Sequence, residues 1–149
     1  MKPAMSAVLA LTLGVFLSAC SGDDNPMDPG PVDGGDGAAR TVKETPSFAN
    51  DVYEVFTRRG CSAGSCHGAG AGGLTMSGAA ATYTALVNVV SPNSGEILVI
   101  PGNANDSYLV KKLEGRQSVG ARMPIGGSAL DNTDLTNIKN WINQGATNN

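Results

Sequence analysis

Two cysteines and a histidine that directly follows the second one stand at residues 61–67, which read Cys61-Ser62-Ala63-Gly64-Ser65-Cys66-His67. This histidine is the only one in the 149-residue chain. Two thiols can add to the two vinyl groups of a haem, and the next histidine can give the iron an imidazole nitrogen. The common motif has two residues between the cysteines, whereas this chain has four, and Gly64 allows the longer loop to bulge. The motif predicts a covalent haem; a Cys61–Cys66 disulfide beside an ordinary histidine is the alternative.

The composition is that of a small domain with few aromatic residues. Aromatic residues make up 5% of the chain and glycine accounts for 20 of its 149 residues, so a self-sufficient core is difficult to build. A covalently held haem would supply a large apolar disc for such a domain to pack against. The formal net charge is −3, and no basic patch of the kind that nucleic-acid binding needs is visible. We therefore expect no nucleic-acid partner.

Residues 1–19 are predicted to be a signal peptide, with Lys2 at its positive start and an apolar run from Ala7 to Leu17. The sequence that follows resembles the lipobox of bacterial lipoproteins, Leu17-Ser18-Ala19-Cys20. That resemblance implies a lipid on Cys20 and an anchor in the cell envelope, on the periplasmic face or the outer surface of the outer membrane. A plain signal peptide cut nearby is the alternative. Nothing after residue 20 is long and apolar enough to span a bilayer.

The three cysteines of the chain fit this organisation. An exported protein with an odd number of cysteines leaves one thiol unpaired in an oxidising compartment. A lipid on Cys20 removes the odd cysteine, whether Cys61 and Cys66 bind a haem or form a disulfide. The cysteine count therefore supports the lipid anchor more than it supports the haem.

Residues 20–44 are predicted to be a disordered, acidic tether. The segment is rich in proline and glycine, contains five aspartates and has few apolar residues. It cannot bury enough surface to offset the loss of chain entropy on folding. A tether of this length spans roughly 25–30 Å by random-coil scaling, enough to hold a domain away from a membrane.

The folded domain is expected over residues 45–149. A first helix is predicted from the apolar face formed by Phe48, Val52, Val55 and Phe56, with Thr45 or Ser47 as its cap and Gly60 as its end. It leads directly into the 61–67 motif. Further helices are expected at about residues 78–88, at 107–114 and from Asp131 to Gly145, with an extended segment at 96–100. We expect Trp141, the only tryptophan, to pack on the first helix.

Several short pieces then occur in one order between Phe48 and Ala146: Cys-x-x-x-x-Cys-His-Gly at 61–68, Gly-Gly-Leu at 72–74, Tyr-Thr-Ala-Leu-Val at 83–87, Pro-Gly-Asn at 101–103, Ser-Tyr-Leu-Val-Lys-Lys-Leu at 107–113, Arg-Met-Pro at 122–124 and Trp-Ile-Asn-Gln-Gly-Ala at 141–146. In combination they resemble the planctomycete-type branch of the monohaem class I cytochromes c. The resemblance covers about 100 residues. It implies a mostly α fold, a small class I cytochrome c-like helical domain packed around one covalent haem.

The same resemblance implies the site residues. Cys61 and Cys66 would form the haem thioethers, His67 would bind the iron on one side, and the sulfur of Met123 would bind it on the other. The chain departs from most cytochromes c in its four-residue spacer, which recurs in this branch. It also has Ile125 after Pro124, where the family often has a second proline.

A physical argument for Met123 stands beside the resemblance. The single histidine excludes a second histidine ligand from this chain, and a thioether is the usual alternative in electron-transfer haems. Met76 lies only nine residues after His67, too close to reach the other side of a haem. Met123 lies 56 residues after His67, in a loop before the last helix. The alternatives are Met123 as a packing residue and an iron with five ligands.

These features predict single-electron transfer outside the cytoplasm by a membrane-anchored domain that is not itself an enzyme, with an unidentified redox protein as partner. Lys111 and Lys112 could form a positive docking rim for that partner, or a solvated helix face. The first alternative function is a haem-free, disulfide-closed surface lipoprotein that acts as a binding module. The second is a peroxidase-like haem with five ligands.

Overall fold

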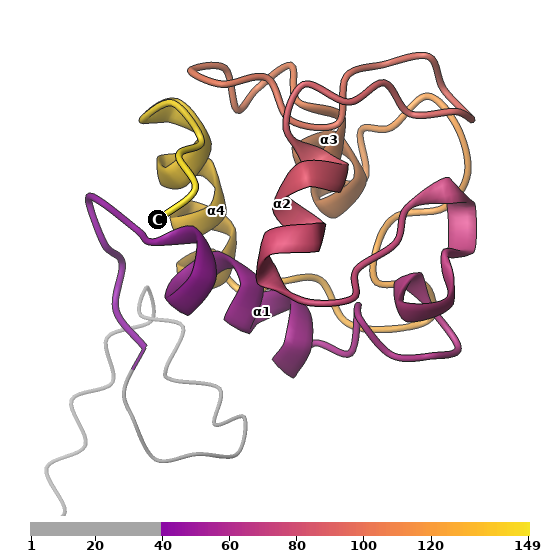
Figure 1. The fold of residues 1–149 in the computed structure, drawn as a ribbon, viewed down its shortest axis with the longest axis horizontal. Helices are drawn as coiled ribbons and strands as arrows, with labels where there is room; N and C mark the ends of the chain where they lie inside the picture. Colours follow the sequence, from indigo (N-terminus) through magenta and orange to yellow (C-terminus); the bar gives the residue numbers. More distant parts are fainter. Residues whose placement is uncertain (1–39) are drawn as a thin grey trace, which may run out of the picture. The chain divides into compact units, whose positions relative to one another are not determined.

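The computed structural model describes residues 40–149, and this part of the chain is mostly helical (Figure 1). Within it no strand is formed beyond isolated β-bridges. The elements in chain order are a π-helical turn η1 (Phe48–Val52), α1 (Tyr53–Arg58), two 3₁₀ turns η2 (His67–Ala69) and η3 (Ala71–Gly73), α2 (Ala79–Leu86), α3 (Tyr108–Glu114) and α4 (Asn132–Asn143). The expected small, mostly helical domain is thus confirmed. The predicted signal peptide, Cys20 and the tether as far as residue 39 lie outside the described residues.

The first helix forms where the apolar pattern predicted it. η1 continues directly into α1, and the predicted apolar face is at most 2% exposed at Phe48, Val52, Val55 and Phe56. Ser47 caps the helix, since its hydroxyl oxygen accepts a hydrogen bond from the Asn50 amide at 3.2 Å. Gly60 follows the helix with a φ of +71°, a conformation that glycine adopts without strain. The chain therefore turns immediately before the 61–67 motif.

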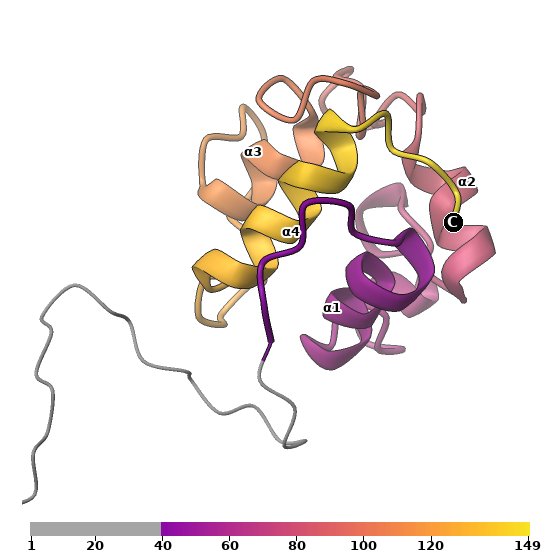
Figure 2. The same cartoon turned by 90° about the vertical axis from the view of Figure 1, so that its left-hand side faces the viewer.

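An aromatic cluster joins the two ends of the domain's sequence. The rings of Phe48 and Trp141 have centroids 4.9 Å apart, and Tyr83 of α2 meets Phe48 edge-on at 5.3 Å. The two polar aromatic groups find backbone partners after α4: the Trp141 indole N–H donates to Thr147 O at 2.9 Å and the Tyr83 hydroxyl donates to Ala146 O at 3.0 Å. The predicted contact between Trp141 and the first helix is confirmed, and it fixes α1, α2 and α4 against one another (Figure 2).

The middle of the chain agrees with the predicted elements. α2 and α3 fall within the expected ranges, and Gly115 ends α3 with a φ of +80°. The expected extended segment at 96–100 takes part in isolated bridges, in which Ile97 pairs with Val90 and Val99 pairs with Val87. This segment returns the chain from α2 to the start of α3.

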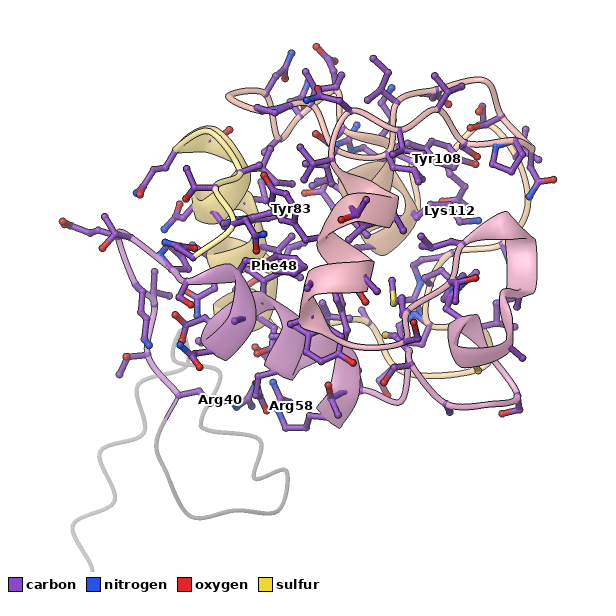
Figure 3. The ribbon with its side chains drawn as sticks, viewed as in Figure 1. Arg40, Phe48, Arg58, Tyr83, Tyr108 and Lys112 are labelled. Atoms are coloured by element: carbon purple, nitrogen blue, oxygen red, sulfur yellow. The ribbon has the colours of Figure 1, made fainter. Side chains whose placement is uncertain are left out.

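α4 begins with a network of charges at its positive end. Asp131 caps the helix by accepting a hydrogen bond from the Asp134 amide at 2.9 Å. Asp134 is 2% exposed, and its carboxylate accepts two hydrogen bonds from Arg58 Nη2 at 2.8 and 2.9 Å. Arg40 donates to both aspartates, at 2.7 and 2.8 Å (Figure 3). A buried carboxylate is tolerated only with such partners, and here they tie α1 to α4.

Residues 40–44 run along α4. The Asn137 side chain accepts from the Lys43 amide at 2.7 Å and donates to Thr41 O at 3.0 Å, and Asn140 Nδ2 donates to Lys43 O at 2.8 Å. Three of the last five residues of the segment that we expected to be a disordered tether, Arg40, Thr41 and Lys43, are therefore hydrogen-bonded to α4 or its cap. The composition of the segment did not reveal this because the partners lie almost a hundred residues later in the sequence.

The helix cap at Asp131 predicts a pH-dependent contribution to stability. Burial opposes ionisation, but the Asp134 amide and Arg40 hold the pKa of Asp131 below its ordinary value. The contribution is therefore complete above the unfolded-state pKa of about 4 and is lost as the pH falls through the folded-state pKa. We expect Asp131→Ala to lower the free energy of unfolding by about 1 kcal/mol at pH 7, and by less at pH 3, as measured by urea unfolding.

Asp131→Asn is the matched control. It keeps a side-chain oxygen for the cap and removes only the charge that faces Arg40, so its loss at pH 7 should be the smaller one. Equal losses for the alanine variant at both pH values would contradict this assignment.

Candidate functional site

The 61–67 motif forms one closed turn after α1. The Cys61 amide donates to Phe56 O at 2.8 Å, and the His67 amide donates back to Cys61 O at 3.0 Å. Cys61 is half-buried against the core, and Cys66 is exposed. Burial raises the pKa of the Cys61 thiol, which keeps it protonated at neutral pH. Both thiols of this turn are free, so both are available for addition to another group.

The imidazole of His67 has a fixed orientation. Its Nδ1 lies 2.8 Å from Ala71 O and 3.3 Å from Leu74 O. A carbonyl oxygen can only accept, so Nδ1 carries the proton and Nε2 presents its lone pair. Metal-binding histidines are commonly held in this way by a backbone carbonyl, which fixes the tautomer and makes the other nitrogen a better ligand. Ala71 contributes only its backbone, and the sequence analysis did not identify it.

The glycine-rich stretch after His67 is held close to the motif. A Cβ on Gly68 would stand 2.3 Å from Ser62 O and 2.8 Å from Ala63 O, so no side chain fits there. Farther along, a Cβ on Gly73 would stand 2.5 Å from the Pro92 ring, and Asn93 Nδ2 donates to Gly72 O at 2.7 Å. The turn after α2 thus fixes the loop that supplies the carbonyl for His67. Sequence reasoning missed this contact because it joins residues 21 positions apart.

Met123 lies at the edge of the core, in the loop that joins α3 to α4 (residues 115–131, the α3–α4 loop). Its side chain is half-buried against the core residues. Its amide donates to Lys112 O at 2.9 Å, and the bond to Pro124 is a cis peptide. Met76, the other methionine of the described residues, is 3% exposed and belongs to the core itself. Met123 is therefore the more accessible thioether of the two.

The two segments that carry the predicted ligands share one end of the domain. In Figure 1 the segment between α1 and α2 and the α3–α4 loop both extend to the end that lies away from the C-terminus. Figure 2 shows α3 and α2, the helices next to them, on opposite sides of the domain. Cys61, Cys66 and His67 come together in one turn, and Met123 comes from the other segment.

The two adjacent lysines of α3 have separate partners. Lys111 forms an ion pair with Glu96, and this pairing, together with a hydrogen bond from Ser118, holds the pKa of Glu96 below its ordinary value. Lys112 directs its ammonium to carbonyl oxygens of the α3–α4 loop. Both lysines that the sequence offered as a docking rim or as a solvated helix face therefore have partners within the domain.

Other kinds of site are not apparent in residues 40–149. No group of three or more histidine, cysteine, aspartate and glutamate side chains that could hold a metal ion occurs in this range. No helix found there has the length and apolar character to cross a membrane. The donor set at the candidate site is instead two thiols, one oriented imidazole and one half-buried thioether. Such a set fits a covalently attached haem, for which one histidine and one methionine suffice.

Because space is lacking around Gly68 and not around Gly64, alanine at these two positions should affect stability differently. Gly68→Ala forces its Cβ into backbone oxygens and should lower the free energy of unfolding by about 1–3 kcal/mol, as overpacking does. Gly64→Ala meets nothing within 4 Å and should change it by less than about 0.5 kcal/mol. Urea unfolding of the two variants measures both values. Equal stability would show that the turn is more open than in this structure.

Comparisons with known proteins add no family to this description. No protein-family model matches the chain, and no curated protein and no solved structure shows significant similarity to it. What the site does must therefore be argued from its own residues and their geometry.

Proposed function

We propose that residues 45–149 form a monohaem c-type cytochrome domain, similar to the planctomycete-type branch of class I, which transfers single electrons and is not itself an enzyme. The observation that carries this proposal is the turn at 61–67. It places two free thiols next to an imidazole whose Nδ1 is bound to Ala71 O, so that Nε2 is the nitrogen available for a metal. The residue is half-buried, and its ring is hydrogen-bonded at Nδ1.

The residues of the turn have distinct roles in this proposal. When bound, a haem c supplies an iron that accepts and releases one electron by cycling between the ferric and ferrous states. The thiols of Cys61 and Cys66 attach it covalently, and His67 Nε2 binds the iron. The Ala71 carbonyl keeps the His67 proton on Nδ1, so that Nε2 is the nitrogen that would bind the iron. Gly68 lets the backbone close tightly beside the attachment residues.

Met123 is the proposed second ligand of the iron. Its thioether is half-buried at the core edge, on the segment that shares an end of the domain with the 61–67 turn. A thioether favours ferrous iron and raises the reduction potential, which suits an electron carrier. Filling this position leaves no open site for a substrate such as a peroxide. The peroxidase-like alternative needs that open site and is therefore the weaker one.

The haem-free binding module is the competing function. It requires a disulfide between Cys61 and Cys66, whose thiols are free in this structure. This alternative also assigns no function to the fixed orientation of the His67 ring. The oriented His67 ring is the feature that supports the cytochrome over this alternative.

Covalent haem attachment is tested by producing the protein in a host with c-type haem maturation. The wild-type band on a denaturing gel should stain for haem peroxidase activity, because thioethers survive denaturation. Cys66→Ser should lose most of the stain. Ser65→Ala is the matched control, since it changes a hydroxyl in the same loop and should stain as the wild type does. An unstained wild-type band with Cys61 and Cys66 linked by a disulfide would contradict the cytochrome proposal.

The second ligand is tested by removing one sulfur at a time with little change in volume. Met123→Leu should abolish the weak sulfur-to-iron absorption band of the ferric protein and lower the reduction potential, because the thioether is lost. Met76→Leu should leave the band and the potential unchanged and cost less than about 1.5 kcal/mol in stability. Absorption spectra and a redox titration measure these effects. The opposite pattern would assign the ligand to Met76.

We also propose that Cys20 carries a lipid that anchors the domain in the cell envelope, where a redox protein is its partner. The lipobox-like sequence Leu17-Ser18-Ala19-Cys20 supports this, and it lies outside the described residues. Cell fractionation should find the protein in membranes. Cys20→Ala should release it or leave it unprocessed, whereas Ser21→Ala should not. A soluble wild-type protein with an unmodified Cys20 would contradict the anchor.

A further inference from the structure

Two side chains of α3 reach across to the α3–α4 loop just before Met123. The Tyr108 hydroxyl donates to Val119 O at 2.9 Å. The Lys112 ammonium donates to Ala121 O at 2.6 Å and to Val119 O at 3.2 Å. Tyr108 and Lys112 are four residues apart, so they lie on the same face of the helix, and Figure 3 shows both beside this loop. The two donors thus converge on residues 119–121.

Lys112 also contacts the loop through its backbone. Its carbonyl belongs to the last turn of α3, where carbonyl groups lack partners within the helix. The Met123 amide donates to this carbonyl at 2.9 Å. One residue therefore binds the loop at two points: its ammonium holds the carbonyls of residues 119 and 121, and its carbonyl holds the amide of residue 123. The contacted groups are therefore the amide of Met123, the proposed ligand, and two carbonyls that come shortly before it in the chain.

Besides these contacts, Ser118 Oγ donates to Glu96 Oε1 at 2.6 Å and Gln117 Nε2 donates to Gly120 O at 3.0 Å. Val119 is 42% exposed and Ile125 is 70% exposed, so neither anchors the loop in the core. Gly120 has a φ of +73° and adds conformational freedom in the unfolded chain. An ammonium has three donors, and Lys112 uses two of them on this loop. It also lies 6.0 Å from the centre of the Tyr108 ring, within reach of a cation–π contact.

We propose that Lys112, with Tyr108, is a positioning residue for the second iron ligand: it holds residues 119–123 so that the Met123 sulfur stays where iron can bind it. This inference rests on the proposed function, in which Met123 is an iron ligand. The contacts of Tyr108 and Lys112 with residues 119–123, which we call the clasp, belong to the chain alone and do not require a haem. The clasp also gives Lys112 a purpose other than docking, since its ammonium is directed to the protein's own carbonyls.

The test compares Lys112→Met, which keeps the aliphatic stem and loses the donors, with Lys112→Arg, which keeps a donor. Lys139→Met is the charge-matched control, because Lys139 pairs with Glu114 and does not touch this loop in the contacts that the structure gives. Two readouts are used on the full chain: hydrogen exchange of the amides of residues 119–123, and, in the haem-loaded ferric protein, displacement of the sulfur-to-iron band by added imidazole.

Loss of the charged donor should make exchange at 119–123 about tenfold faster and should let imidazole displace the sulfur at about a tenfold lower concentration. Lys112→Arg should recover most of both effects, and Lys139→Met should behave as the wild type. Unchanged exchange in Lys112→Met would overturn the clasp itself. Faster exchange with unchanged imidazole binding would overturn its role toward Met123. A wild-type protein that binds haem without the sulfur band would refute the Met123 assignment in the proposed function, whatever the exchange result.

Discussion

The contact between Phe48 and Trp141 is the interaction on which the arrangement of the domain depends. Their ring centroids lie 4.9 Å apart, so the first helix packs against the last one. Residues 53–140 lie between these two contact residues in the sequence. The chain has only five other Phe, Tyr and Trp side chains, so few contacts of this size are available. The charge network of Asp134 with Arg58 and Arg40 adds a second connection between the same helices. With α1 and α4 joined, the intervening segments need not be regular.

The side chains that are proposed to hold a haem lie in those irregular segments. The turn at 61–67 is closed by backbone hydrogen bonds to α1, and the Ala71 carbonyl sets the orientation of the His67 ring. Residues 119–121 of the α3–α4 loop are held by hydrogen bonds from Tyr108 and Lys112. This division is physically reasonable, because a rigid helical frame can position loops whose side chains must remain accessible to a cofactor. Each half of the proposed iron site is thus supported by contacts that come from the protein backbone.

The charged side chains of the described residues mainly form pairs with one another within the domain. Glu96 pairs with Lys111 and accepts from Ser118 at 2.6 Å, so it connects α3 to the start of the α3–α4 loop. Glu114 pairs with both Arg116 and Lys139. Exposed pairs of this kind contribute little individually to stability, typically below about 1 kcal/mol each. Of these contacts, the hydrogen bond from Ser118 to Glu96 is the one that reaches the α3–α4 loop beside the segment that Lys112 binds.

The sequence by itself determined the helices and the order of residues in the turn at 61–67. The apolar spacing of residues 48–56, the stops at Gly60 and Gly115 and the cap at Asp131 are local signals, because helix formation depends on neighbours within about four residues. The order Cys61, Cys66, His67 is also local, so the haem prediction could be made without a fold and stays a prediction. Only the tertiary structure decided which nitrogen of His67 is available, that residues 40–44 bind α4, and that Lys112 faces the loop of Met123. Each of these depends on a backbone carbonyl or a side chain brought close by folding, and backbone carbonyls are the same for every residue and leave no trace in a sequence pattern.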